Sequence, residues 1–104
     1  MKVQNLLKGS ETSPLGSKRT LIHDSPYFKI LLFSFAKGQG LPIHSHEIEG
    51  QVSIQVLKGE GRFLGSDKEL PAKEGDLLIC DIAEPHGVMA ETEMVIIVTI
   101  APPI

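Results

Sequence analysis

The sequence predicts an all-β protein, a small antiparallel barrel or sandwich built from many short strands. Residues 51–57 alternate polar and apolar side chains, and this period of two is the clearest strand signal in the chain. Other β-rich runs are separated by turn residues at intervals of roughly 8–12 residues, a spacing typical of all-β domains. No segment keeps a helical period over several turns. The chain has 104 residues, enough for one hydrophobic core, so we expect a single domain over residues 1–104.

The turn residues divide the chain into its expected elements. Residues 1–19 are expected to form an irregular N-terminal segment, since residues 8–19 are rich in Gly, Ser, Thr and Pro, and residues 20–101 to form the barrel. Residues 65–69 are expected to be a turn without regular structure. The expected strands, each bounded by turn residues, are 20–23, 28–36, 41–46, 51–57, 62–64, 77–82, 86–90 and 94–100.

The composition limits the partners and the setting. The net charge of −3 and the scattered Lys and Arg residues give no reason to expect a nucleic-acid partner. No apolar run is long enough to span a membrane, and the start of the chain is too polar for a signal peptide. The single cysteine, Cys80, excludes an internal disulfide and is expected to be buried and inert, so we expect a reducing, cytoplasmic setting. The aromatic side chains expected in the core are Tyr27, Phe28, Phe33, Phe35 and Phe63.

Three of the four histidines have a spacing that suits one metal ion. His44 and His46 are two residues apart, so on a strand their imidazoles point to the same face. His86 follows about forty residues later, after an apolar run that begins at a glycine. Imidazole binds several divalent first-row metals, so the three histidines predict a metal site without naming its ion. His23 lies before a turn and is expected at the surface.

These residues resemble the two sequence motifs of the cupins. Gly38 is followed after five residues by His44-Ser45-His46 and then by Gly59, which resembles the first motif, G-x5-H-x-H-x3,4-E-x6-G. Gly75 is followed after ten residues by His86, as in the second motif, G-x5-P-x-G-x2-H-x3-N. The resemblance covers roughly residues 28–100 and is closest to small single-domain members of the RmlC-like cupin superfamily (cupin type 2, conserved barrel). It implies a small antiparallel jelly-roll β-barrel.

The chain departs from this pattern where the fourth metal ligand is expected. The glutamate of the first motif is absent, and its place falls on Gln51 when counted from His46 and on Val52 when counted from Gly59. Strand phase places Val52 on the buried face, where it cannot bind a metal. Gln51 points inward instead if the strand begins with a bulge, since one extra residue reverses the side-chain phase. Both alternatives stay open at this point. In the second motif, the positions of Pro, Gly and Asn hold Asp81, Ala83 and Ala90.

The resemblance implies a site and a class of function. The ion would be a divalent transition metal (Zn, Fe, Mn or Ni) at the barrel mouth, held by His44, His46, His86 and Gln51 and bound by a small-molecule ligand or substrate. It also implies a homodimer, which apolar faces in residues 28–36 support. The protein would be either a metal-dependent enzyme, similar to dioxygenases or isomerases, or a non-enzymatic module that binds a small ligand such as a sugar; a metal-free degenerate cupin is the third possibility. The expected pocket lining is Ile43, Val52, Ile54, Val56 and Met89. Asp81 and Glu84 are expected to accept hydrogen bonds from the imidazoles and so to orient them.

Overall fold

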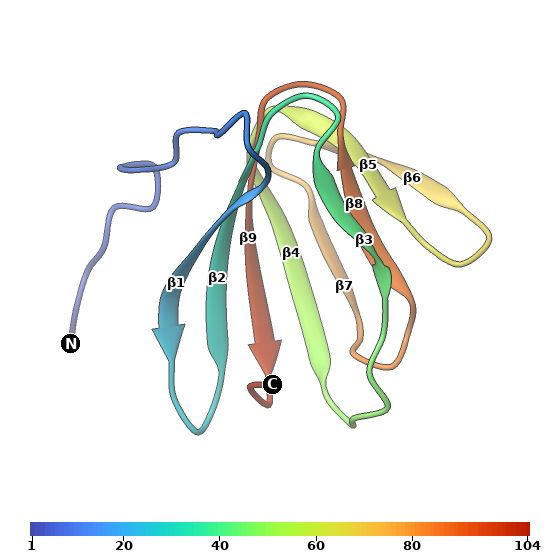
Figure 1. The fold of residues 1–104 in the computed structure, drawn as a ribbon. Helices are drawn as coiled ribbons and strands as arrows, with labels where there is room; N and C mark the ends of the chain where they lie inside the picture. Colours follow the sequence, from blue (N-terminus) through green and yellow to red (C-terminus); the bar gives the residue numbers. More distant parts are fainter.

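The fold consists of two antiparallel β-sheets that face each other, in a computed structural model that describes all residues from 1 to 104. One sheet has the strand order β1-β2-β9-β4-β7 and the other the order β3-β8-β5-β6 (Figure 1). Most successive strands cross from one sheet to the other, as in a jelly roll, and this confirms the predicted fold class. The strands are β1 (Lys18–Asp24), β2 (Lys29–Phe35), β3 (Gly40–His44), β4 (Gln51–Lys58), β5 (Glu60–Leu64), β6 (Glu69–Lys73), β7 (Leu77–Asp81), β8 (His86–Ala90) and β9 (Met94–Ala101).

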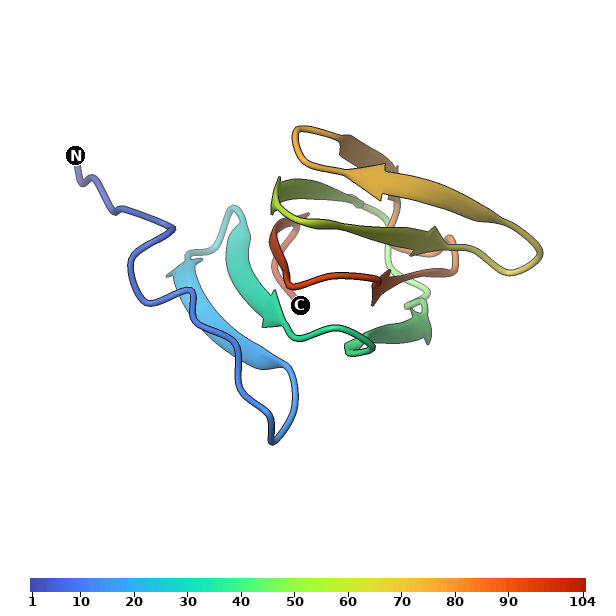
Figure 2. The ribbon, with the colours of Figure 1, turned by 90° about the horizontal axis from the view of Figure 1, so that it is seen from above.

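The main core lies between the two sheets, and the period of two in β4 shows how the sequence builds it. Val52, Ile54 and Val56 are buried there, whereas the intervening side chains face the other side of the sheet. Residues 94–98 of β9 are all apolar because both faces of this part of the strand are covered. Its outward residues Val95 and Ile97 pack in a second cluster, against which Leu6 of the N-terminal segment lies. Figure 2 shows this segment running beside the β1–β2 edge of the larger sheet.

The structure differs from the sequence-based expectation at two places. The strand β6 was not predicted: Glu69 was expected in a turn and residues 70–73 were assigned to no strand, since no apolar alternation marks them and only Ala72 is buried. It is an edge strand that pairs only with β5, and such an edge tolerates Pro71. Tyr27 and Phe28 were expected in the core but lie exposed in the turn between β1 and β2. The structure contains no helix with the length and apolar character to cross a membrane.

The topology brings the ends of three segments to one opening of the barrel. β3 pairs with β8, and His44 at the end of β3 is the register partner of His86 at the start of β8. The loop from residue 45 to residue 50 then crosses to the opposite sheet, where β4 begins at Gln51 (Figure 1). The candidate site lies at this opening, near the last residues of the chain.

Candidate metal centre

His44 and His86 are held together by strand pairing and by the main chain. As cross-strand partners they point to the same side of the smaller sheet, and their ring centroids lie 4.6 Å apart. His86 Nδ1 lies 2.6 Å from the carbonyl oxygen of Glu84, and His44 Nδ1 lies 2.8 Å from that of Pro42. A carbonyl oxygen can only accept a hydrogen bond, so each Nδ1 carries a proton. In the neutral form of each ring, Nε2 is then the nitrogen with a free lone pair.

His46 reaches the same place from the loop after β3. Its ring centroid lies 5.9 Å from that of His44. Its main-chain N–H donates to the carbonyl oxygen of Ile82 (3.2 Å), and the N–H of Ile82 donates to the carbonyl oxygen of Gly50 (3.0 Å). The fully buried Ile82 thus ties down both ends of the loop that carries His46.

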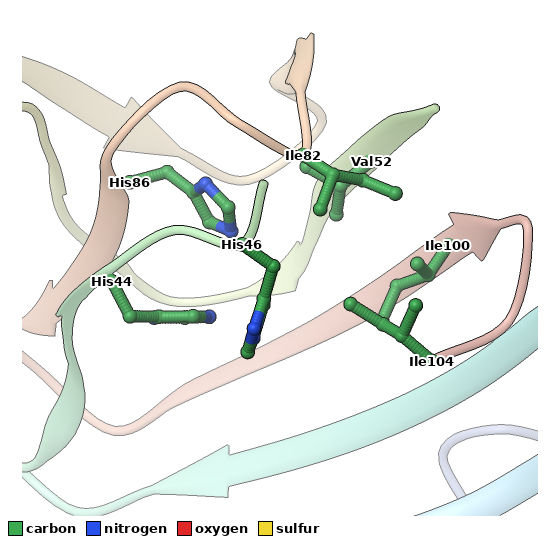
Figure 3. A pocket seen from close by; sticks show the side chains of 7 residues that line it. All are labelled: His44, His46, Val52, Ile82, His86, Ile100 and Ile104. Atoms are coloured by element: carbon green, nitrogen blue, oxygen red, sulfur yellow. The ribbon is translucent and has the colours of Figure 1, made fainter. Parts of the chain in front are cut away.

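The three histidines line one side of a pocket of about 280 Å³ at the barrel opening. Figure 3 shows their rings gathered on one side and aliphatic side chains on the other. The aliphatic lining residues are Val52, Ile82, Ile100 and Ile104.

The donor set suits a divalent transition metal. His86 is buried, and burial is the main cause that lowers its pKa below the ordinary value, with smaller contributions from His44 and His46. The hydrogen bond to Glu84 opposes this shift without cancelling it. A neutral imidazole whose other nitrogen donates to a carbonyl is the form that binds metals. In their present orientations no three His, Cys, Asp or Glu side chains are spaced to hold an ion. His46 is exposed and, unlike the other two rings, makes no hydrogen bond that holds its orientation.

Strand phase at the start of β4 decides which residue faces the histidines. Val52 is buried, with 3% of its surface exposed, and lines their pocket. Gln51 is exposed on the other face, where its Nε2 donates to Oδ1 of Asp81 at 3.3 Å. The pairing of β4 with β7 is continuous from Gln51 onward, and that with β9 shifts only after Val56, so no bulge turns Gln51 inward. The structure brings His44, His46 and His86 together and leaves Gln51 outside.

Two of the expected lining residues lie on the outside of the barrel. Ile43 and Met89 are 48% and 41% exposed. Met89 pairs with Arg62 in the register of β8 and β5, whereas Phe63 and Val88 of the neighbouring pair are buried, so Met89 faces outward. For Ile43 the reason is an irregularity in the β3–β8 register between residues 41 and 44, which changes the side-chain phase.

The other expected residues are also placed differently from the expectation. Ile54 and Val56 lie in the core between the sheets, on the same face as Val52 but beyond the pocket. Asp81 contacts Gln51 through its carboxylate and does not reach the histidines. Glu84 does support His86, but with its main-chain carbonyl.

Sequence reasoning missed Ile82, Ile100 and Ile104 as lining residues. Ile100 had a usable signal, because it continues the alternation of the inward residues Ile96 and Val98. Ile82 had a similar signal, because the expected strand 77–82 places it in phase with the inward Leu78 and Cys80, although β7 ends at Asp81. Ile104 lies outside the strands, where no periodic pattern predicts orientation.

The fold and this pocket define a small jelly-roll barrel protein with a histidine-lined opening. A family model described as a cupin domain matches residues 31–100. The chain therefore belongs to the cupin domain family.

Individual relatives agree with this assignment. The chain is similar to a solved RmlC-like cupin protein from Desulfovibrio desulfuricans, with 48% identity and a TM-score of 0.95 over 100% of this chain and 99% of that chain. It shares the fold of a protein from Thermus thermophilus at 22% identity and a TM-score of 0.90, with both chains covered in full. It is also 32% identical over 71 residues to the oxalate-binding protein of Thermotoga maritima, covering 65% of this chain and 58% of that protein's length.

Proposed function

We propose that this protein binds a divalent transition-metal ion with His44, His46 and His86 and accepts a small molecule at that ion. The observation that carries the proposal is the convergence of three imidazoles on one pocket. Two of them already have Nδ1 placed on a main-chain carbonyl, which fixes the tautomer that metal binding requires. Zn, Fe, Mn and Ni all suit such a set of ligands.

The apolar Val52 in the fourth position has a chemical consequence. Because Val52 has no ligand atom, three histidines leave coordination positions open for water and for a ligand. A metal bound there supplies a Lewis acid that polarises an oxygen of the ligand, or a centre that activates dioxygen when the ion is iron. His44, His46 and His86 would fix the position of the ion, and the aliphatic side chains form the opposite wall of the pocket.

A second candidate is a binding module that catalyses no reaction. The observation that favours it is the pocket lining, in which no Asp, Glu, Lys, Ser or Tyr side chain accompanies the histidines. General acid–base chemistry needs such a group within reach of the substrate. The oxalate-binding name of the Thermotoga maritima relative also supports a ligand that coordinates the metal through a carboxylate group. A sugar fits less well, because its many hydroxyls would face aliphatic side chains.

A homodimer in a cytoplasmic setting completes the proposal. Leu77 and Ile79 are exposed on β7, an edge strand of the larger sheet. Apolar side chains on a free edge are suited to contact with a second copy. Light scattering coupled to size exclusion, with Ile79→Lys as the variant, measures this part of the proposal separately from the site.

The test of the metal site is elemental analysis of protein purified without an affinity tag. We expect close to one equivalent of a transition metal, reduced at least tenfold in His86→Ala and in His44→Ala. His23→Ala is the matched control, because His23 lies in another region, against Phe28. Unchanged metal content in the first two variants would show that the site is wrongly placed. A thermal-shift ligand screen on the metal-loaded protein, followed by product analysis of each hit, separates an enzyme from a binding module.

A further inference from the structure

The pocket has two chemically different walls. All of its polar side-chain atoms belong to the three histidines, and the opposite wall contains only branched aliphatic side chains (Figure 3). A ligand that fills the pocket therefore meets metal and imidazole at one end and no hydrogen-bonding side chain at the other. A polar group placed against that wall would lose its bonds to water without replacement, whereas a methylene group would gain by leaving water.

The outer part of the aliphatic wall comes from the last residues of the chain, which are held in place. Lys29 Nζ donates to the main-chain oxygen of Ile104 at 2.6 Å, so the start of β2 fixes the segment that follows β9. Gly50 lets this segment pass close to the start of β4. A Cβ built at Gly50 would collide with the carbonyl oxygen of Ala101 and lie 2.8 Å from Cδ1 of Ile82. The segment is thus packed against the residues that form the pocket.

Ile104 stands at the rim of the pocket. Its side chain lines the pocket and is still 40% exposed, whereas Val52 and Ile82 are fully buried. The size of this side chain therefore affects how far a ligand can extend from the histidines. The volume of about 280 Å³ is at the low end of the range for small-molecule pockets, so the molecule must be small.

The geometry points to an amphipathic ligand, with a metal-coordinating polar head at the histidines and a short apolar body against the aliphatic wall, and to Ile104 as the residue that sets the length of that body. This inference rests on the proposed metal site and adds the class of ligand and a specificity-determining residue. It disfavours ligands that are polar throughout, because they would leave the aliphatic wall in water.

A series of straight-chain alkyl hydroxamates on the zinc-loaded protein tests the inference. The hydroxamate head chelates the metal in every member, and only the tail changes. We expect the Kd from titration calorimetry to fall about fourfold for each added methylene that the wall covers, and then to level off once the pocket is full. Ile104→Ala should weaken the gain per methylene. Ile104→Phe should shift the best tail to a shorter one. Ile43→Ala is the matched control, because Ile43 faces outward near the site.

The outcomes distinguish a failure of the metal site from a failure of the ligand class. If zinc or acetohydroxamate does not bind, the proposed metal site is wrong and this inference falls with it. If acetohydroxamate binds but longer tails bring no gain, the metal site stands and the amphipathic ligand class is overturned. If the gain per methylene is the same in Ile104→Ala as in the unchanged protein, the assignment of Ile104 is overturned.

Discussion

His44 and His86 are register partners across β3 and β8, and their ring centroids lie 4.6 Å apart at the barrel opening. This pairing makes the two rings neighbours without any long-range loop contact, because cross-strand partners in antiparallel strands share a face. Each ring is fixed further by a main-chain carbonyl two residues before it in the chain. The strand register therefore determines the positions of His44 and His86, whereas the position of His46 depends on the loop after β3.

The phase of β4 predicts which substitution adds the missing carboxylate. Val52→Glu should place a carboxylate on the pocket face and tighten zinc binding at least about tenfold, since a fourth protein ligand joins the histidines. The metal-free variant should be less stable than the unchanged protein, because a carboxylate replaces a buried apolar group. Competition with a chromogenic chelator measures the zinc Kd.

Gln51→Glu is the matched control for this prediction. It places the same carboxylate one residue earlier, on the exposed face beside Asp81. Its zinc Kd should change less than twofold. A stronger effect for Gln51→Glu than for Val52→Glu would mean that β4 has the opposite phase in solution.

The thiol of Cys80 should react slowly and stabilise the fold in a pH-dependent way. Burial is the main cause that raises its pKa, and the carboxylates of Glu84 and Asp81 raise it further. A raised folded-state pKa means that the neutral thiol stabilises the fold fully below the pKa of the unfolded chain, about 8.5. This stabilisation is lost as the pH rises through the folded-state pKa.

Alkylation by iodoacetamide measures the shift of Cys80 directly. The rate at pH 8 should be several times lower in the folded protein than in urea-unfolded protein, because the thiolate is the reactive form. Asp81→Asn should raise the rate in the folded protein. The prediction fails if folded and unfolded protein react equally fast, and Cys80→Ser shows the background.

Much of the site follows from short-range patterns in the sequence. The alternation in residues 51–57 places Val52, Ile54 and Val56 on one buried face, and the structure agrees. The spacing of the three histidines predicted that they would meet, and they line one pocket. These features were predictable because strand phase depends only on neighbouring residues.

The unpredicted features depend on contacts between distant segments. Ile104 reaches the pocket through its bond to Lys29, and the orientation of Ile43 depends on the irregular β3–β8 register. β6 has a single buried residue, so its sequence has no apolar alternation from which a strand could be predicted. Phe28 and Phe35 belong to one β-rich run, and residue type alone does not distinguish them. Phe28 lies in an exposed turn, whereas Phe35 lies in the core.

The difference between these two phenylalanines predicts unequal costs of truncation. Phe35 is completely buried between the sheets and stacks on Phe33. Phe35→Ala should lower the free energy of unfolding by about 3–5 kcal/mol, because it leaves a cavity. Phe28→Ala should cost about 1 kcal/mol or less, since the ring is partly exposed and contacts only one other ring, that of His23. Urea denaturation measures both values, and similar costs would contradict the placement of Phe28 at the surface.

A methyl group at Gly50 should disturb the pocket by displacing the segment after β9. Gly50 has a φ of +153°, and an added Cβ meets the main chain of Ala101 and the side chain of Ile82. Gly50→Ala should cost about 1–3 kcal/mol from the backbone conformation, and more from these collisions. Gly75→Ala is the matched control, because Gly75 also has a positive φ but has no atom within 4 Å of its added Cβ.

Two measurements separate the collision at Gly50 from simple backbone strain. Urea denaturation should show a larger loss for Gly50→Ala than for Gly75→Ala. Hydrogen exchange of the Ile82 amide, which donates to the carbonyl oxygen of Gly50, should become faster only in Gly50→Ala. Since this bond also ties down the loop of His46, the same variant should bind zinc more weakly. If Gly50→Ala and Gly75→Ala lose equal stability and the exchange of the Ile82 amide is unchanged, then the segment after β9 is not packed closely against Gly50 and Ile82.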